Sequence, residues 1–377
     1  MSRRSKRRER RDKKRLEKKE KLKQFDNFEN VASLKSLYYS AKKASNGVSW
    51  KASVQRYLLS ILFKISRTRK DLLNGKDVRQ GFIEFDLNER GKTRHIKSVH
   101  FAERVVQKSI CSNALYPVLT HSLIYDNYAS QKGKGTHFAE KRLVKFLHEF
   151  YRKHGRNGYI LLIDFKSYFE NIPHEPLKET FRKYFTDERL IKLSDDFVEA
   201  FGERGLGLGS ETSQINAIAH INYIDHFIKV IEAMRYYGRY MDDNFVLHQS
   251  KEHLQKLLNK LEILYEKYGV ILNKKKSKIV SLKHSFTFLK TRYFITDKGK
   301  IIRKPCQDSI TRERRKLKGQ GKLYIKGILT KPEVEQSFNS FKGSMLHRNA
   351  RKTVYALTKL YKELFEKENE YGSKKTI

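Results

Sequence analysis

The sequence predicts an α+β fold built around a ferredoxin-like sheet, in which strands and helices follow the order β-α-β-β-α-β. Three observations predict this order. The apolar run at residues 159–163 has the length of a buried strand and leads directly into Asp164. Two short segments rich in aromatic and β-branched residues flank the adjacent pair Asp242-Asp243, as the strands of a β-hairpin flank its turn. Apolar residues at helical spacing lie between these segments and recur at residues 254–268.

Composition indicates a polyanionic partner. The chain has 377 residues, of which 38% are hydrophobic, so it is long enough for two or three lobes with cores of their own. Its 81 Lys and Arg against 42 Asp and Glu give a formal net charge of +39, which repels itself unless an anion is bound. Nucleic acid is therefore the first candidate partner, and an anionic membrane surface is the second.

Several other classes of protein are disfavoured. No apolar run beside the motifs approaches the length of a membrane span, and the basic N-terminus has no apolar stretch behind it that would make a signal peptide. Cys111 and Cys306 are the only cysteines, which excludes a disulfide scaffold and a Cys-rich zinc site. The prediction is a reducing, cytoplasmic setting with no membrane partner.

The chain before the apolar run is predicted to be mainly helical. Residues 1–24 form a basic, low-complexity arm that is either solvated or partly helical, and a functional arm would grip phosphates without reading sequence. Helical spacing begins near residue 25, and residues 79–99 contain two strands joined by a turn. A helix follows from Ala102 and is expected to end near Pro117.

Two glycine-containing loops lie on either side of the apolar run. Residues 126–137 carry two glycines and two lysines, which suits either a surface turn or a triphosphate site; the loop is not a Walker loop. Residues 205–214 contain three glycines whose spacing is not that of a dinucleotide fingerprint. This second loop leads into a segment that is predicted to be one long helix reaching Ile231.

Beyond the hairpin and its helix, the sequence predicts short strands and then a basic helical region. Strands are predicted at residues 270–272, 277–282 and 286–294. From Pro305 onward the chain is basic and mostly helical, and it ends in an apolar stripe that is typical of a packed core.

The residues alone leave two interpretations of the pair Asp242-Asp243. Two like charges at a hairpin tip repel one another, and a divalent cation such as Mg²⁺ would offset the repulsion; the alternative is a solvated turn. The predicted sheet places the end of the first strand beside the tip, so that Asp164 would converge with the pair. Two Mg²⁺ ions held ~3.5–4 Å apart would then activate an attacking 3′-hydroxyl and stabilise the leaving pyrophosphate.

The ordered motifs resemble those of the reverse transcriptases, specifically the prokaryotic ones, over roughly residues 80–300. Tyr240-Met241-Asp242-Asp243 is similar to the family's catalytic Tyr-x-Asp-Asp box. Asp164, with the aromatic Phe169 five positions later, resembles the family's first metal motif. The resemblance implies a right-hand polymerase with fingers, a ferredoxin-like palm and a mostly helical thumb. The implied divisions are an arm at 1–24, fingers at 25–157, a palm at 158–295 with part of the fingers between 175 and 212, and a basic thumb or C-terminal helical region at 296–377.

The resemblance also implies a two-metal catalytic site. Asp164 and Asp242 would be the main ligands, with Asp243 in support and the backbone carbonyl of Phe165 as a further ligand. The implied ions are Mg²⁺, for which Mn²⁺ can substitute. The ring of Phe169 would lie where a ribose 2′-hydroxyl would be, so that the enzyme prefers dNTPs.

Further residues are implied to contact the nucleotide or the nucleic acid. The loop at 205–214 resembles the family's next motif, but Leu208 replaces the polar residue that many relatives carry. A comparable apolar replacement occurs in enzymes of diversity-generating retroelements, which copy inaccurately. Lys274 or Lys276 resembles the lysine-bearing motif after the hairpin, and Lys290 stands where relatives usually have glycine in the primer-grip turn. The implied nucleotide-binding set is Lys132, Lys134, Phe169, Leu208, Gly209, Gln214 and Lys276, and the template or primer set is Arg94, Tyr240, Met241, Phe288, Leu289 and Lys290.

The implied function is that of an RNA-directed DNA polymerase, a nucleotidyltransferase that uses an RNA template, a DNA or RNA primer and dNTPs. A dedicated structured non-coding RNA and an accessory protein are further expected partners. The absence of a zinc cluster and an RNase H motif favours a stand-alone enzyme, with phage defence as its expected role and retron or diversity-generating types as alternatives. Two other readings stay open: a nucleic-acid-binding protein that keeps a polymerase scaffold without catalysis, and synthesis of another product such as a homopolymer.

Overall fold

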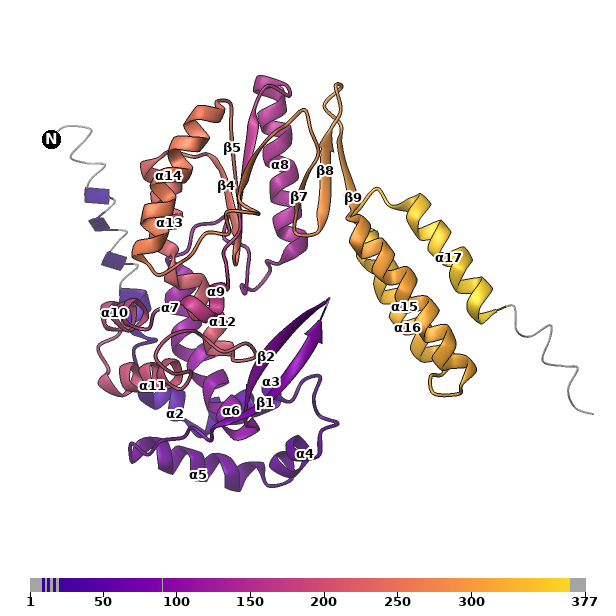
Figure 1. Cartoon of the computed structure of the whole chain (residues 1–377). Coiled ribbons are helices and arrows are strands. Elements are labelled where there is room, and N and C mark those ends of the chain that lie inside the picture. The colour runs from indigo at the N-terminus through magenta and orange to yellow at the C-terminus, as the bar shows by residue number, and fades with distance from the viewer. Residues whose placement is uncertain (1–8, 11, 14–15, 18–19, 90, 367–377) are drawn as a thin grey trace, which may run out of the picture.

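The computed structural model describes residues 9–10, 12–13, 16–17, 20–89 and 91–366 (Figure 1). Its strands form a two-stranded hairpin, a four-stranded sheet and a three-stranded sheet, among many helices. None of the helices within these ranges is long and apolar enough to cross a membrane. Of the basic arm at 1–24, positions 1–8, 11, 14–15 and 18–19 lie outside the described residues, and the described positions up to residue 23 are helical.

The four-stranded sheet confirms the predicted ferredoxin-like order. Its strands are β3 (Tyr159–Ile163), β4 (Tyr236–Tyr240), β5 (Asp243–His248) and β6 (Lys278–Ser281). They lie side by side as β4-β5-β3-β6, and every neighbouring pair is antiparallel. The register pairs Ile163 with Asn244, so the C-terminal end of β3 and the turn between β4 and β5 meet at the same end of the sheet.

Both faces of this sheet are buried, because its side chains alternate between two hydrophobic cores. Leu161 and Val246 belong to one core, together with apolar residues of α12 (Glu211–His220) and α14 (Lys251–Lys267). Ile160 and Phe245 belong to the other, together with residues of α8 (Thr136–His154) and of the three-stranded sheet. A strand that is covered on both sides must be apolar throughout, which is why residues 159–163 form an unbroken apolar run.

The N-terminal region is helical with one hairpin, as predicted, but its central helix does not end at Pro117. Instead α6 (Phe101–Ile110) continues through a π-helical turn, η1 (Cys111–Leu115), into α7 (Tyr116–His121). Pro117 lies in the first turn of α7, a position that proline favours because its fixed φ suits the start of a helix. The other elements of this region are α2 (Phe28–Ala32), α3 (Leu34–Ala44), α4 (Ala52–Leu59), α5 (Ile61–Leu73), β1 (Phe82–Glu89) and β2 (Lys92–Val99).

The segment between β3 and β4 holds several short helices rather than one long final helix. After α12, the chain breaks at Ile221 and continues as α13 (Asn222–His226) and a π-helical turn, η2 (Phe227–Ile231). The prediction of a single helix reaching Ile231 was therefore wrong. The preceding elements are α9 (Tyr168–Asn171), α10 (Glu175–Tyr184) and α11 (Glu188–Glu199).

Two of the strands predicted after α14 also differ. Residues 270–272 do not form a strand, since only Leu272 makes an isolated bridge, to Phe165. Residues 286–294 are two strands rather than one, β7 (Phe286–Phe288) and β8 (Thr291–Ile295). The chain reverses between them because Leu289 and Lys290 both adopt positive φ, 46° and 60°, as a tight two-residue hairpin turn requires.

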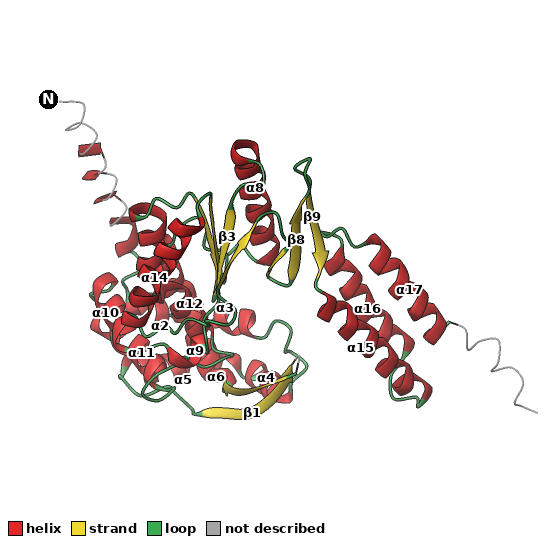
Figure 2. Cartoon of the chain, turned by 45° about the horizontal axis from the view of Figure 1, so that its top comes forward, coloured by secondary structure: helices red, strands yellow, loops and turns green. Residues whose placement is uncertain are grey.

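The C-terminal residues form a bundle of three helices that follows the three-stranded sheet. Strand β9 (Ile301–Pro305) completes that sheet, and α15 (Gln307–Ile325), α16 (Lys331–Met345) and α17 (Arg351–Phe365) form the bundle. The bundle has a hydrophobic core of its own, around Leu317, Phe338 and Leu357. Figure 2 shows it projecting beyond β9, away from the helices that cover the four-stranded sheet.

Candidate active site

The tip of the β4–β5 hairpin is the centre of the candidate site. Tyr240 pairs with Asp243 across the two strands, so Met241 and Asp242 make the two-residue turn. Met241 has φ of 57°, a left-handed conformation that is uncommon for a residue with a side chain. Strain of this kind persists only where the surrounding structure holds it in place.

The structure brings Asp164 to this tip. Asp164 follows the last residue of β3, and that residue pairs with Asn244 on β5. Its carboxylate accepts a hydrogen bond from Nδ2 of Asn273 at 2.9 Å and two from Nζ of Lys276 at 3.0 Å. Three carboxylates that lie far apart in the sequence are therefore gathered at one end of the sheet.

The charges of these carboxylates oppose one another. Burial raises the pKa of Asp243 to about 7, and the negative charges of Asp242 and Asp164 add to the rise. Burial also raises the pKa of Asp242; Asp164 contributes further, while Lys276 and Arg94 act in the opposite direction. Carboxyl groups with strongly raised pKa values that share a cluster are typical of functional sites, because folding alone does not require such a cluster.

The residues suit a divalent cation in their chemistry. Carboxylate and carbonyl oxygens are the ligands that Mg²⁺ prefers, and a cation would relieve the repulsion from Asp242 and Asp164, which adds to the effect of burial on the pKa of Asp243. The carboxylate side chains do not converge on one point in this arrangement: among the described residues, no group of three or more His, Cys, Asp and Glu is placed to hold an ion. In this arrangement the ammonium of Lys276 supplies the positive charge at Asp164.

The structure distinguishes the two lysines that follow the hairpin helix. Lys276 lies at the carboxylate of Asp164, whereas Lys274 pairs with Glu262 on α14 at 2.6 Å. The backbone N–H of Asn273 also donates to the carbonyl of Asp164, at 2.8 Å. The segment after α14 thus holds the first carboxylate from both its side chain and its backbone.

Phe169 and the glycine-containing loop at 205–214 are held together by backbone hydrogen bonds. The N–H of Leu206 donates to the carbonyl of Phe169 at 2.7 Å, and the N–H of Gly205 donates to that of Ile172 at 2.8 Å. Gly205 has φ of 89°, and a Cβ there would lie 2.8 Å from the carbonyl oxygen of Glu170, so only glycine fits. Phe169 is half-buried at this contact.

Three more of the predicted nucleotide-binding residues lie in the loop at 205–214. Leu208 is half-buried and Gly209 is exposed, and a Cβ on Gly209 would lie 3.9 Å from Ile96 on β2. Gln214, at the start of α12, accepts a hydrogen bond from the hydroxyl of Ser130 at 3.3 Å. This contact links the 126–137 loop to the 205–214 loop.

The two lysines of the 126–137 loop are not equivalent. Nζ of Lys134 donates to the carbonyls of Tyr125 and Asn127, at 2.8 and 2.9 Å, and burial lowers its pKa. Lys134 therefore holds the loop together instead of projecting toward a ligand. Lys132 is exposed, and its backbone N–H donates to the hydroxyl of Tyr116 at 2.7 Å.

The predicted template and primer residues also differ in their surroundings. Phe288 is buried against Phe245, with ring centroids 5.1 Å apart, so it anchors the β7–β8 turn. Leu289 is half-buried and Lys290 is exposed at that turn. Arg94 is exposed on β2 and favours the charged form of Asp242. Tyr240 and Met241, at the hairpin tip, are half-buried.

A buried ion pair that the sequence analysis did not assign lies directly behind the tip. The side chains of Arg239 on β4 and Asp225 on α13 are 0% and 1% exposed, and Nη2 of Arg239 lies 2.6 Å from the carboxylate. Nε of Arg239 donates to both carboxylate oxygens, at 2.8 and 3.0 Å. Asp225 also accepts a hydrogen bond of 2.5 Å from the hydroxyl of Tyr237.

The same guanidinium reaches the backbone of the turn. Nη1 of Arg239 donates to the carbonyl of Met241 at 3.2 Å, and Nη2 donates to that of Ile218 on α12 at 2.7 Å. Burial alone would lower the pKa of Arg239, but the charge of Asp225 more than compensates, and the net pKa is raised. Arg239 thus joins the hairpin tip to the helices below the sheet.

The sequence did carry a signal for this pair. Asp225 interrupts a run in which Ile221, Ile224 and Ile228 are all buried. A carboxylate on an apolar helix face needs a buried cation, since an unpaired charge there is costly. The signal does not say which cation, because Arg239 lies in a different element.

Comparisons with known proteins give a family match and several similar solved structures. A family model described as "Reverse transcriptase (RNA-dependent DNA polymerase)" matches residues 80–292, more than half of the chain. No match was found among curated proteins. Similar solved structures include the telomerase of Candida albicans in complex with a TWJ fragment of telomeric RNA, at 13% identity and a TM-score of 0.49 over 83% of this chain and 65% of that one.

Two structures of Candida tropicalis telomerase are similar as well. The apo enzyme has 16% identity and a TM-score of 0.47, over 84% of this chain and 64% of that one. The apo enzyme truncated of its C-terminal domain has 14% identity and a TM-score of 0.46, over 59% of this chain and 55% of that one. The chain thus spans between 55% and 65% of the length of these telomerase chains.

Proposed function

The chain belongs to the reverse transcriptase (RNA-dependent DNA polymerase) family and has a right-hand polymerase fold, and on this premise we propose that it extends a 3′-hydroxyl with dNTPs on an RNA template. RNA-directed DNA polymerases are nucleotidyltransferases. The observation that carries the proposal is the gathering of Asp164, Asp242 and Asp243 at one end of the four-stranded sheet. Phosphoryl transfer uses bound divalent cations, and carboxylates that the fold holds close together despite their mutual repulsion can bind them.

Divalent cations are part of the proposal, with Mg²⁺ as the ion and two ions per site. Asp164 and Asp242 would hold them, with Asp243 and the carbonyl of Phe165 in support. Bound ions would activate the attacking hydroxyl and stabilise the charge of the leaving pyrophosphate. The chain's own contribution is to hold the carboxylates on rigid strands, with Asn273 and Lys276 orienting Asp164.

The three lobes follow from the same assignment. We propose fingers at 25–157, a palm at 158–295 with part of the fingers between 175 and 212, and a thumb at 296–377. The separate core of the C-terminal bundle supports an independent thumb, and the four-stranded sheet lies within the proposed palm.

The incoming nucleotide would lie between Phe169 and the loop at 205–214. The backbone hydrogen bonds from this loop to Phe169 and Ile172 support the assignment, since they fix its distance from the first metal motif. Leu208 would then face the nucleotide without a polar group, which predicts inaccurate copying. Lys132, Gly209, Gln214 and Lys276 complete the proposed nucleotide site, and Arg94, Leu289 and Lys290 would contact template or primer.

Primer extension tests the proposed activity. With an RNA template, an annealed DNA or RNA primer, dNTPs and Mg²⁺, the full chain should make DNA whose sequence is complementary to the template. EDTA should stop the reaction. Tight RNA binding without incorporation would instead indicate a binding protein on a polymerase scaffold, and products that ignore the template would indicate homopolymer synthesis.

The finer type of enzyme is proposed from the sequence motifs. We propose a stand-alone prokaryotic enzyme that works with a dedicated structured RNA, acts in phage defence and engages an accessory protein. The lysine-glycine loop at 126–137 is similar to that of group II intron and retroelement enzymes, which supports the prokaryotic assignment. Sequencing the nucleic acid that co-purifies with the chain distinguishes a single dedicated RNA, which the proposal requires, from a random collection of cellular RNA.

Replacing Phe169 with alanine should weaken selection against ribonucleotides. The half-buried ring of Phe169 would no longer exclude a 2′-hydroxyl, so the ratio of kcat/KM for dNTPs to that for rNTPs should fall about 10–100-fold, the range for a change of pocket shape. Phe294→Ala removes a half-buried ring on β8 and should leave the ratio unchanged. Undiminished selectivity in Phe169→Ala would remove the gate role.

A further inference from the structure

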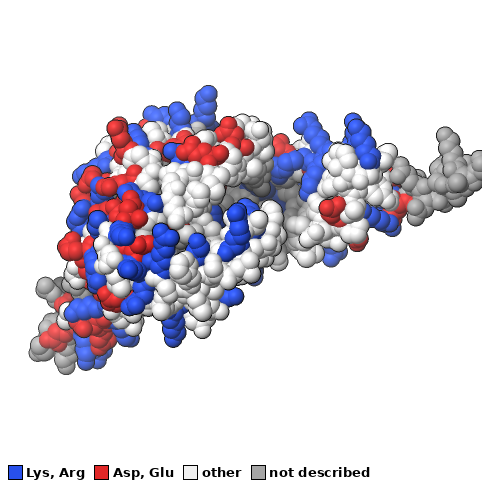
Figure 3. All heavy atoms as spheres, turned by 90° about the horizontal axis from the view of Figure 1, so that it is seen from below, with Lys and Arg blue, Asp and Glu red and all other residues white. Residues whose placement is uncertain are grey.

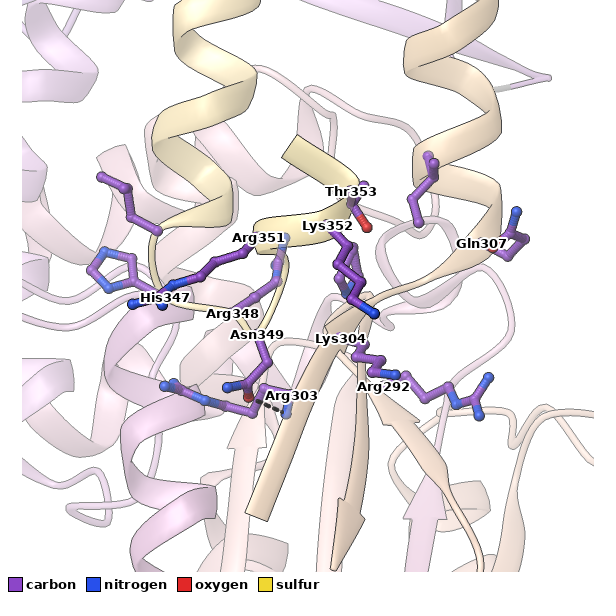
Figure 4. A pocket seen from close by; sticks show the side chains of 13 residues that line it. Arg292, Arg303, Lys304, Gln307, His347, Arg348, Asn349, Arg351, Lys352 and Thr353 are labelled. Atoms are coloured by element: carbon purple, nitrogen blue, oxygen red, sulfur yellow. Dashed lines mark hydrogen bonds between the residues drawn. The ribbon is translucent and has the colours of Figure 1, made fainter. Parts of the chain in front are cut away.

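Two pockets in the described part of the chain differ in the charge of their linings. The larger, of about 910 Å³, lies between β9 and α17, and its lining holds six Lys and Arg and no Asp or Glu (Figure 4). Figure 3 shows Lys and Arg side chains on both the bundle and the body of the molecule. The smaller pocket, of about 430 Å³, departs from this pattern, because Lys183 and Glu179 are the only Lys, Arg, Asp or Glu in its lining.

The smaller pocket lies among helices. Its walls come from α7, α10, the end of α12, α13 and the residue that follows α14. Figure 1 shows α10 and α13 on the side of the four-stranded sheet that faces away from the C-terminal bundle. The volume of the pocket is within the range of small-molecule sites, about 300–1,000 Å³. Its lining is mainly aromatic and uncharged polar, which suits a ligand with little charge.

His220 is buried in this lining and has one ring nitrogen without a partner. The residue is 5% exposed, and its Nε2 lies 2.8 Å from the carbonyl oxygen of Tyr268. A carbonyl only accepts, so Nε2 carries the proton, and burial lowers the pKa of His220 to about 4, which keeps the ring neutral at pH 7. Nδ1 therefore carries a lone pair, and it has no hydrogen-bond partner among the described residues.

Asn222 provides a second acceptor in the same lining. Its Nδ2 donates to the carbonyl and the hydroxyl of Ser122, at 3.3 and 3.1 Å, and these bonds fix which way the amide points. Its Oδ1 is buried and has no partner within the described ranges. A buried acceptor without a donor is costly. Both unpaired atoms accept, so the pocket is suited to a ligand that donates hydrogen bonds.

Two tyrosines give the pocket a flat aromatic wall. Tyr223 is 59% exposed, and its ring stacks on that of Tyr268, with centroids 6.0 Å apart and an angle of 18° between the planes. An exposed ring beside buried acceptors offers its face to a planar ligand. Lys183 and Glu179 on α10 form no ion pair with any described residue, so both charges are available to a ligand.

We infer that this pocket binds an amino-substituted purine base, carried by a nucleoside or a nucleoside monophosphate. The N–H groups of the base would donate to Nδ1 of His220 and Oδ1 of Asn222, while its ring stacks on Tyr223, the two ways in which proteins read an unpaired base. Guanine is the closest match, because it presents a ring N–H beside its amino group, whereas adenine presents the amino group alone. Lys183 suits a single phosphate.

The pocket is separate from the carboxylates of the candidate active site. Asn222 and Tyr223 begin α13, and the hairpin tip is reached only through Asp225 on the same helix and its partner Arg239. Neither Asp242 nor a divalent cation takes part in the inferred contacts. Binding in the pocket can therefore be measured apart from polymerisation, and its failure would leave the proposed function untouched.

Isothermal titration calorimetry tests the pocket on the full chain carrying Asp242→Asn, in EDTA, with GMP as the probe. GMP should bind, and inosine monophosphate, which lacks the amino group, should bind about 10-fold more weakly because one buried acceptor loses its donor. Ribose 5-phosphate, which has no base, should not bind. Tighter binding of AMP than of GMP and inosine monophosphate would support the pocket and identify adenine as its base.

Two tyrosine variants locate the bound base. Tyr223→Ala removes the stacking ring and should weaken GMP binding about 10-fold or more, the scale of a lost base–aromatic stack, whereas Tyr223→Phe should retain it. Tyr355→Ala is the matched control, since Tyr355 is 76% exposed on α17, and it should leave the affinity unchanged. Both rings are exposed, so thermal unfolding should show an intact fold in each variant.

NMR of the histidine nitrogens tests the buried acceptor itself. GMP should change the ¹⁵N shift of Nδ1 of His220, and ribose 5-phosphate should not. Three outcomes would overturn the inference. Absence of GMP binding at about 1 mM would leave the pocket to water. Equal binding of GMP and ribose 5-phosphate would reduce the site to a phosphate contact at Lys183. Equal losses in Tyr223→Ala and Tyr355→Ala would place the base elsewhere.

Discussion

Replacing Asp242 with asparagine should abolish nucleotide incorporation while leaving the fold intact. Asp242 lies in the turn of the β4–β5 hairpin, and its pKa is raised by burial and by Asp164. Removing its charge takes away a proposed metal ligand, so kcat should fall by at least ~10³-fold, the scale of charge stabilisation in phosphoryl transfer. Single-nucleotide primer extension measures this loss.

The stability of the same variant distinguishes a catalytic carboxylate from a structural one. A raised pKa means that the folded state disfavours the charged form, so the charge of Asp242 lowers stability at neutral pH and its removal should leave the unfolding temperature equal or higher. Mg²⁺ should raise the unfolding temperature of the wild type but not that of Asp242→Asn. Surviving polymerase activity in Asp242→Asn would contradict the assignment of the site.

A surface carboxylate provides the matched control. Asp297 lies in the turn between β8 and β9, and its side chain is 91% exposed and pairs with Arg156. Asp297→Asn removes the same charge and should change neither incorporation nor the effect of Mg²⁺ on stability, since an exposed ion pair contributes little. If both variants lost activity equally, the loss would reflect net charge and not the hairpin.

The central sheet could be predicted because each of its parts leaves a local signal. A strand buried on both faces is apolar throughout, as residues 159–163 are, and a two-residue turn between aromatic strands marks the hairpin. The order of these signals along the chain then fixes which ends meet. Asp164 could be placed beside Asp242 for this reason, without any side-chain geometry.

Features that depend on neighbours distant in sequence could not be predicted. Pro117 was expected to end a helix, but a π-helical turn before it allows the proline to sit in the first turn of the next helix. The residue pattern alone predicted one strand over 286–294 and not the turn between β7 and β8, because Leu289 and Lys290 are not residues that favour positive φ; only the family resemblance indicated a turn there. Neither Asp225 nor Arg239 indicates its partner locally, since they belong to α13 and β4.

Replacing Arg239 with methionine should destabilise the protein strongly. Arg239 and Asp225 are fully buried, and removing one partner of a buried pair leaves an unpaired charge, which costs about 3–5 kcal/mol. Chemical denaturation should show this decrease in the free energy of unfolding. Arg235→Met provides the comparison: Arg235 pairs with Glu149 at 2.9 Å but is 63% exposed, so its loss should cost less than about 1 kcal/mol.

The double variant Arg239→Met, Asp225→Asn separates stability from positioning. It leaves no unpaired charge, so it should recover most of the lost stability, and the introduced amide oxygen can still accept from the hydroxyl of Tyr237, as the carboxylate of Asp225 does. It cannot restore the donor to the carbonyl of Met241, which holds the left-handed turn beside Asp242. Its kcat should therefore stay about 10–100-fold below that of the wild type, with KM little changed, because a small displacement of a catalytic group lowers the rate about 100-fold. A double variant with wild-type kcat would show that Arg239 serves stability alone, whereas low kcat in a stable protein would make it the residue that positions the catalytic turn.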